Sequence, residues 1–110
     1  MNNKMNISSA QTAETTLKAL ANAKRLQVLS LLAERELSVT GINRHIDLSQ
    51  SALSQHLALL RKAGLVHTRR DGQTIFYSLD DDGHQIRNIL TALSADQWLE
   101  QPWKPYKVLP

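Results

Sequence analysis

Short polar side chains that can read nucleic-acid bases gather in one stretch of the chain, from residue 49 to residue 56. A glutamine amide pairs through two hydrogen bonds with adenine, and a serine hydroxyl can address several bases, so both types suit the major groove of DNA. These groups are also short enough to let a helix backbone approach the bases. The candidate base-reading residues are Gln50, Ser51, Ser54 and Gln55.

Cationic and polar side chains suited to phosphate surround that stretch. Arginine and lysine attract phosphate by charge, and hydroxyl, amide and imidazole groups add hydrogen bonds that position a protein on the duplex. Four cations fall between residues 61 and 70, although the formal net charge of the whole chain is only +3. The candidate residues for the DNA backbone and for a wing are Ser49, His56, Arg61, Lys62, Arg69, Arg70, Gln73 and Thr74.

The spacing of apolar residues predicts the helix that must present the polar face. Leu53, Leu57 and Leu60 recur at helical spacing, Ser49 is a suitable N-cap, and Gly64 suits the left-handed residue after the helix end. The break before it, residues 47–49, has the three-residue length typical of a helix-turn-helix. Two earlier helices are expected within residues 12–23 and 23–36. A third helix from residue 38, with a core face at positions 39, 42 and 46, completes this part of the fold.

After residue 64 the apolar period changes from that of a helix to that of a strand. Residues 65–70 and 74–79 are expected to form two strands, joined at Asp71-Gly72, a strong hairpin signal. Asp80 to Asp82 then open a last helix. The expected fold is mainly α with a small β-hairpin: four helices, a hairpin and a final helix in the order of a winged helix-turn-helix.

Bulk composition excludes several classes of function. A chain of 110 residues forms one small domain, for which dimerisation would supply extra burial. The absence of cysteine excludes disulfides, thiolate metal sites and thiol redox switching. No apolar run reaches the ~20 residues of a membrane span, and the N-terminus lacks an apolar signal core. Without a nucleophile–base pair or a phosphate loop, we expect no enzyme, no cofactor, no membrane partner and a cytoplasmic location.

Four segments carry a family resemblance: KALANAKRLQVLSLL, ELSVTGI, LSQSALSQHLALLRKAGLV and RRDGQTIFYSL. Through them the chain resembles the ArsR/SmtB family of bacterial winged-helix regulators, and within it the HlyU/NolR-like branch. The resemblance implies a homodimer on an inverted-repeat operator in double-stranded DNA, a repressor of transcription located at the nucleoid. It also implies a leader at 1–11, a DNA-binding and dimerisation domain at 12–95 and an extension at 96–110. The dimer contacts expected on the first and last helices are Leu17, Leu20, Ile86, Ile89, Leu90 and Leu93.

The two metal sites of the resembling family are incomplete in this sequence. Ser38 and Thr40 stand where one site has thiolates, and hydroxyls are poor ligands for soft metals. In the last helix Asp82 and His84 match one half of a zinc site. The other half falls on Ala95 and Trp98, with Asp96 one residue out of register, so two ligands stand where zinc takes about four. No metal is therefore expected.

Two other interpretations stay open at this point. One is a zinc-responsive repressor of the same family, and the other is a winged-helix module that binds proteins but no DNA. An effector, either a small molecule or a protein, also stays open, with Trp98, Trp103 and Tyr106 of the tail as candidate contacts.

Overall fold

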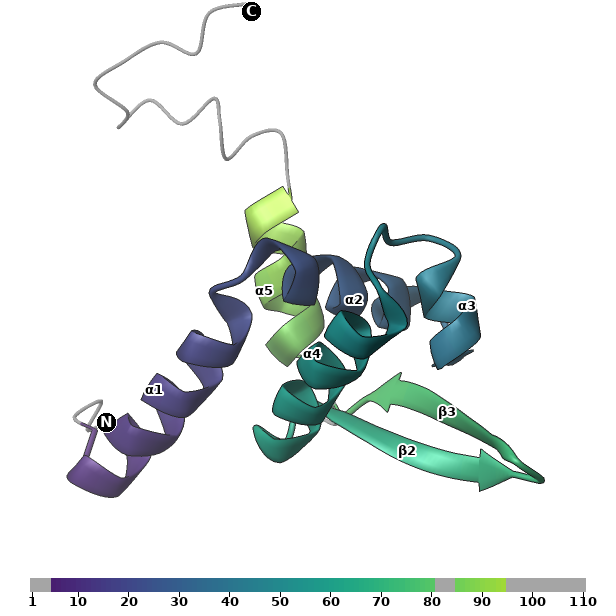
Figure 1. The fold of residues 1–110 in the computed structure, drawn as a ribbon. Helices are drawn as coiled ribbons and strands as arrows, with labels where there is room; N and C mark the ends of the chain where they lie inside the picture. The colour runs from purple at the N-terminus through teal and green to yellow at the C-terminus, as the bar shows by residue number, and fades with distance from the viewer. Residues whose placement is uncertain (1–4, 81–84, 95–110) are drawn as a thin grey trace, which may run out of the picture. The chain divides into compact units, whose positions relative to one another are not determined.

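The computed structural model describes residues 5–80 and 85–94. The elements in chain order are α1 (Ile7–Leu20), α2 (Ala23–Glu34), β1 (Leu37–Ser38), α3 (Val39–Asn43), α4 (Gln50–Lys62), β2 (Val66–Asp71), β3 (Thr74–Leu79) and α5 (Gln85–Ser94). The mainly helical fold with a small antiparallel sheet is the one that the sequence predicted (Figure 1). Residues 1–80 and 81–110 form two compact units.

Helix α1 begins earlier than the sequence analysis expected. The expected leader covers residues 1–11, but the helix starts at Ile7 and so includes residues 7–11. The reason is a local cap: the side chain of Asn6 accepts a hydrogen bond of 2.8 Å from the backbone N–H of Ser9. This bond satisfies one of the N–H groups that the first turn leaves without a helical partner.

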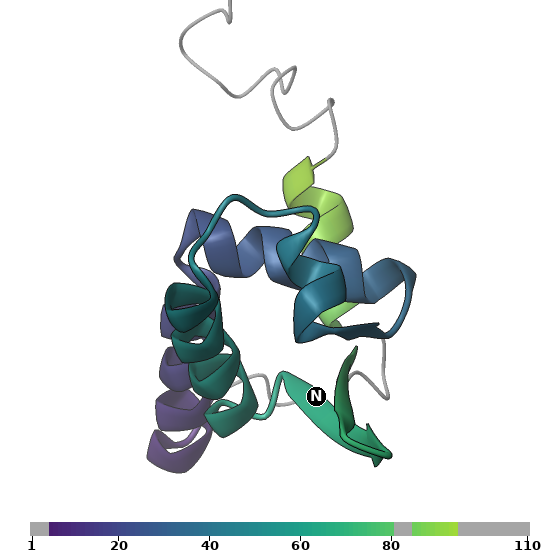
Figure 2. The same ribbon diagram turned by 45° about the vertical axis from the view of Figure 1, so that its right-hand side comes forward.

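The core of the first unit is built by α2, α3, α4 and the sheet. Helix α4 contacts α2, α3 and β2, and α2 also contacts β3. Figures 1 and 2 show α2, α3 and α4 grouped together, with the β2–β3 hairpin extending away from them. The side chains most completely buried between these elements are Val28, Leu29, Ile42, Leu53, Leu57 and Leu60.

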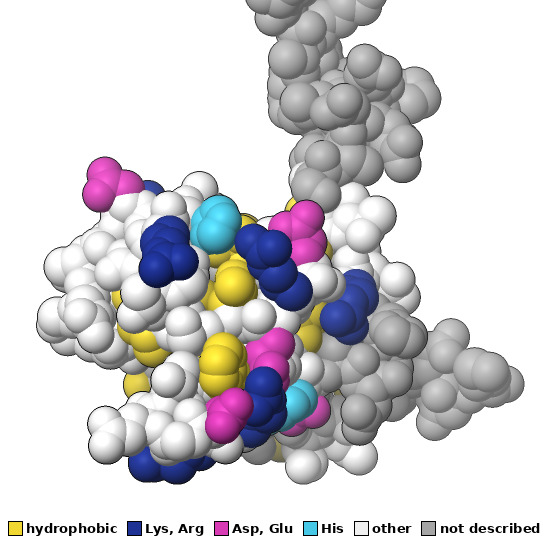
Figure 3. Space-filling model, turned by 90° about the vertical axis from the view of Figure 1, so that its right-hand side faces the viewer, with side chains coloured by type: hydrophobic (Ala, Val, Ile, Leu, Met, Phe, Trp, Pro, Cys, Tyr) yellow, Lys and Arg dark blue, Asp and Glu magenta, His cyan; other side chains and the backbone are white. Residues whose placement is uncertain are grey.

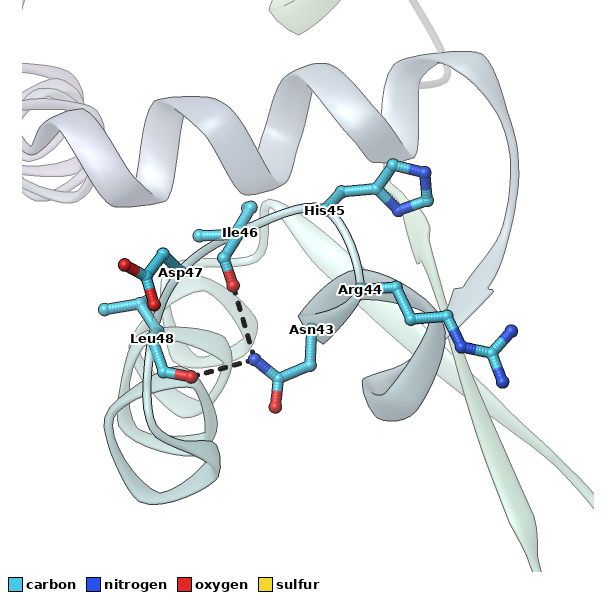
Figure 4. A pocket seen from close by; sticks show the side chains of 6 residues that line it. All are labelled: Asn43, Arg44, His45, Ile46, Asp47 and Leu48. Carbon is cyan, nitrogen blue, oxygen red and sulfur yellow. Dashed lines mark hydrogen bonds between the residues drawn. The ribbon is translucent and has the colours of Figure 1, made fainter.

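The connection between α3 and α4 is longer than the predicted three residues. Helix α3 ends at Asn43, so residues 44–49 form the turn. The side chain of Asn43 donates to the backbone oxygen of Leu48 at 2.9 Å and to that of Ile46 at 3.4 Å (Figure 4). Ile46 is still buried, as the sequence predicted, but from the turn and not from a helix.

Both ends of α4 follow the sequence prediction. The hydroxyl of Ser49 accepts a hydrogen bond of 3.1 Å from the backbone N–H of Ala52. At the other end Gly64 has a φ of +77°, a conformation that glycine adopts without steric cost. The N–H groups of Gly64 and Leu65 then bond to the carbonyls of Arg61 and Leu60, both at 3.0 Å, which closes the helix end.

The sheet has one strand more than predicted. Its order is β1-β3-β2, and all neighbouring strands are antiparallel. Asp71 pairs with Thr74, so the two-residue hairpin loop is Gly72-Gln73, one residue later than Asp71-Gly72. Gly72 has a φ of +63°, as a tight hairpin loop requires. Strand β1, of two residues, is too short to leave a periodic signal in the sequence.

Helix α5 belongs to the second unit. Residues 81–84, which include most of the acidic run expected to open it, lie outside the described residues. No helix within residues 5–80 and 85–94 is long and apolar enough to cross a membrane.

Candidate nucleic-acid interface

The four candidate base-reading residues share one exposed face of α4. Gln50, Ser51, Ser54 and Gln55 are all exposed, whereas the leucines of the opposite face are at most 1% exposed. Within the described part of the chain, no hydrogen bond engages any of these four side chains. The helix therefore presents donors and acceptors that a base edge can use.

Some of the residues expected at the DNA backbone around α4 already have a hydrogen-bond partner within the protein, and others do not. The hydroxyl of Ser49 is the N-cap of α4. His56 is half-buried, and its Nδ1 lies 3.3 Å from Nη1 of Arg25. Arg61 and Lys62 are exposed in the last turn, and neither has a partner among the described residues. Among the residues expected at the DNA backbone around α4, these two cations are therefore open to phosphate.

The wing presents its two arginines on opposite faces, because successive side chains of a strand alternate. Arg70 is exposed and unpaired within the described residues. Gln73 and Thr74 are also exposed, in the hairpin loop and at the start of β3. All three can reach a phosphate from the tip of the hairpin.

Arg69 differs from the expectation that it is open to DNA. Its Nε lies 2.9 Å from both carboxylate oxygens of Glu36, and its Nη2 lies 2.7 Å from Oε1. These hydrogen bonds lower the pKa of the Glu36 carboxyl, with smaller contributions from the Ser78 hydroxyl and the charges of Arg69 and His67, while burial opposes them. They likewise raise the pKa of Arg69. The structure thus pairs Arg69 within the protein.

Charges on the face shown in Figure 3 are mixed. Acidic side chains adjoin several of the Lys and Arg side chains, so this face has no continuous basic surface. An arginine next to a carboxylate contributes less positive potential than its formal charge implies. Attraction of phosphate therefore depends on the unpaired cations of α4 and the wing.

The six residues expected in the dimer fall into two groups. Leu17 is 62% exposed, Ile89 36% and Leu93 47%, so these three can contact another copy. Leu20, Ile86 and Leu90 are already buried in the single chain, so they can add little area to such a contact. In α1 an open apolar groove runs past Ala10, Ala13 and Leu17.

The structure offers no support for a metal within the described ranges. No group of three or more histidine, aspartate or glutamate side chains in residues 5–80 and 85–94 could hold a metal ion. The hydroxyl of Ser38 is the N-cap of α3 and accepts from Gly41 N–H at 3.1 Å. The positions of the expected half zinc site, 82, 84, 95, 96 and 98, lie outside the described residues, as do Trp103 and Tyr106.

Three residues have structural roles around the interface that the sequence pattern did not predict. They are Glu36, Arg25 and Asn43, which hold Arg69, His56 and the turn before α4. The partners of Glu36 and Arg25 lie 33 and 31 residues away, so no local spacing reveals them. Asn43 had a local signal, since an asparagine just before a turn often bonds to the backbone.

A helix-turn-helix followed by a β-hairpin with exposed cations defines a winged helix-turn-helix. The sequence profile described as "Bacterial regulatory protein, arsR family" matches residues 22–68. The chain is 49% identical over 85 residues to nodulation protein NolR of Rhizobium meliloti, covering 77% of this chain and 68% of NolR. It therefore belongs to the arsR family, whose members here are transcription regulators and not enzymes.

Other comparisons agree. Transcriptional activator HlyU of Vibrio cholerae is 57% identical to this chain over 67 residues. The match covers 61% of this chain and 62% of HlyU, so it spans somewhat less than two thirds of that relative. The crystal structure of NolR from Sinorhizobium fredii has a TM-score of 0.72 at 44% identity, covering 84% of this chain and 94% of that one. A structure of HlyU from Vibrio cholerae has a TM-score of 0.71 at 47% identity, and the match covers 81% of this chain and 94% of that one.

Proposed function

We propose that this chain is a sequence-specific DNA-binding regulator that represses transcription as a homodimer on an inverted-repeat operator. The observation that carries the proposal is the exposed polar face of α4, with Gln55 and three further short polar residues open to bases. Arg61, Lys62 and Arg70 would contact phosphates and fix the position of that face. Because the chain has no cysteine, thiolate-bound metal does not gate it.

The dimer is supported by exposed apolar side chains on α1 and on α5. Leu17, Ile89 and Leu93 are large apolar residues in contact with water in the single chain, and a second copy would cover them. Two copies related by a two-fold axis would place two α4 helices in successive major grooves, about 34 Å apart. An inverted repeat in the DNA matches that symmetry, and binding to chromosomal DNA would place the protein at the nucleoid.

Selection from a library of random DNA duplexes tests this function. We expect the full chain to enrich duplexes that contain an inverted repeat, and to bind the enriched duplex at least about 1,000-fold more tightly than a scrambled one. Sedimentation should show two chains for each duplex. Enrichment of no sequence above the starting library would overturn the proposal, and reporter transcription with the enriched sequence at the promoter distinguishes repression from activation.

A further inference from the structure

Glu36 and Arg69 meet across the sheet although they lie 33 residues apart in the sequence. Leu37 pairs with Tyr77, so Glu36 stands opposite Ser78 at the edge of β1. Arg69 pairs with Phe76 on the other side of β3. The carboxylate therefore extends over the middle strand, and the Ser78 hydroxyl donates to its Oε2 at 3.0 Å.

Arg69 is held from two directions. Its guanidinium makes a two-pronged contact with the carboxylate, and its Cζ lies 4.6 Å from the centroid of the Phe76 ring. A planar guanidinium matched to a carboxylate and stacked on a ring is a geometry that lysine cannot reproduce. About half of the Arg69 side chain stays exposed, so its site is the surface of the wing and not the core.

Arg70 has the opposite environment. It follows Arg69 directly in β2, so its side chain lies on the other face of the hairpin, the face that also carries Val66 and Leu79. Those two residues are buried against the body at the base of the wing. The wing thus has one neutralised cation, Arg69, on the face that carries Phe76. Its unpaired cation, Arg70, lies on the opposite face, with Val66 and Leu79.

We propose that Glu36 is a positioning residue for DNA recognition: it holds Arg69 away from phosphates and leaves Arg70 as the phosphate contact of the wing. This assignment rests on the proposed DNA-binding function. Its consequence is for general affinity, because a second open cation on the wing would strengthen binding to every sequence alike. Glu36 therefore limits the salt-dependent affinity of the wing for DNA of any sequence, and leaves the ratio of specific to non-specific affinity unchanged.

Two single variants separate this role from a merely structural one. Glu36→Gln and Arg69→Gln both break the same ion pair, but only Glu36→Gln releases a cation. The dependence of log affinity on log salt concentration is measured on a duplex of random sequence. Glu36→Gln should steepen this slope by about 0.9 for each chain bound, and Arg69→Gln should leave it unchanged. Arg70→Gln, the matched neighbour, should flatten it by about 0.9.

The double variant Glu36→Gln/Arg69→Gln should return the slope to that of the wild type. With the enriched duplex in the same assay, Glu36→Gln should strengthen binding to the enriched and the random duplex by the same factor, so that the ratio of specific to non-specific affinity stays that of the wild type. Equal changes of slope in Glu36→Gln and Arg69→Gln, or a flatter slope in Arg69→Gln, would overturn the assignment. The slopes need no preferred sequence, so a failed selection would overturn sequence-specific function alone.

Discussion

Arg25 connects the end of α1 to the recognition helix α4 through His56. Its Nε donates to the carbonyl of Ala19 at 2.7 Å, its Nη2 donates to that of Lys18 at 3.1 Å, and its Nη1 faces Nδ1 of His56 at 3.3 Å. A guanidinium has only donors, so Nδ1 of His56 is the acceptor in this contact. One side chain of α2 thus satisfies open carbonyls of α1 and fixes a residue of α4.

Replacement of Arg25 should therefore loosen both contacts at once. We expect Arg25→Ala to lower the free energy of unfolding by about 1–2 kcal/mol, because carbonyls at the end of α1 lose a charged donor. Arg25→Lys should recover little, since an ammonium cannot supply the same directed set of donors. Urea denaturation measures the effect, and Lys24→Ala, which removes the adjacent cation, is the control. A loss as large in Lys24→Ala would contradict the assigned bonds.

Asn43 should be needed for the turn that sets the start of α4. Asn43→Ala removes the donor to the carbonyls of Leu48 and Ile46, and we expect a loss of about 1–2 kcal/mol in the free energy of unfolding. Asn43→Asp should cost at least as much, because a carboxylate would face two carbonyl oxygens. The comparison is made by chemical denaturation above pH 6. Greater stability of Asn43→Asp than of Asn43→Ala would show that the amide does not donate to this turn.

The Glu36–Arg69 ion pair should make the stability of the wing sensitive to acid. Folding lowers the pKa of Glu36 below its usual 4.5, so its contribution is present above about pH 4.5 and is lost as the pH falls through the lowered value. We expect the melting temperature of the wild type to exceed that of Glu36→Gln by a constant amount from pH 8 to about 5.5, and the gap to close in stronger acid. A gap that widened in acid would have the wrong sign for this pair.

Local signals in the sequence were sufficient for α4 and the wing. The N-cap at Ser49, the leucine spacing and Gly64 each act within one or two helical turns, and the hairpin depends on a loop of two residues. The exposed face of α4 follows from the same spacing, because Gln50, Ser51, Ser54 and Gln55 lie on the side of the helix away from Leu53, Leu57 and Leu60.

What the sequence could not predict depends on partners far along the chain. Strand β1 forms only because β3 offers an open edge to Leu37 and Ser38, which would otherwise continue a loop. Arg69 looked like a free cation because Glu36, which pairs with it, is separated from it by α3, α4 and the turns between them. The early start of α1 is a different case, because a capping asparagine at residue 6 was visible but was included in a polar leader.

Gln55 should contribute to sequence preference and not to general affinity for DNA. It is exposed on α4, and loss of a two-pronged contact to one base removes about 1–3 kcal/mol of discrimination. We expect Gln55→Ala to weaken binding to the enriched duplex and to leave binding to a scrambled duplex unchanged, as measured by fluorescence anisotropy at fixed salt. Gln27→Ala, an exposed glutamine of α2, is the control. Equal weakening on both duplexes would remove Gln55 from the reading face.

Leu17 should be a contact between two copies of the chain. It is 62% exposed and lies beside the alanines of the groove in α1, where burial by a second copy would remove apolar surface from water. Leu17→Asp places a charge in that contact, and we expect the dissociation constant of the dimer to rise at least about tenfold, which corresponds to about 1.4 kcal/mol. Thr12→Asp introduces the same charge on α1 away from the groove, so it should leave the dissociation constant of the dimer unchanged. Analytical ultracentrifugation over a dilution series measures both, and equal dissociation in the two variants would mean that charge on α1, and not loss of Leu17, separates the copies.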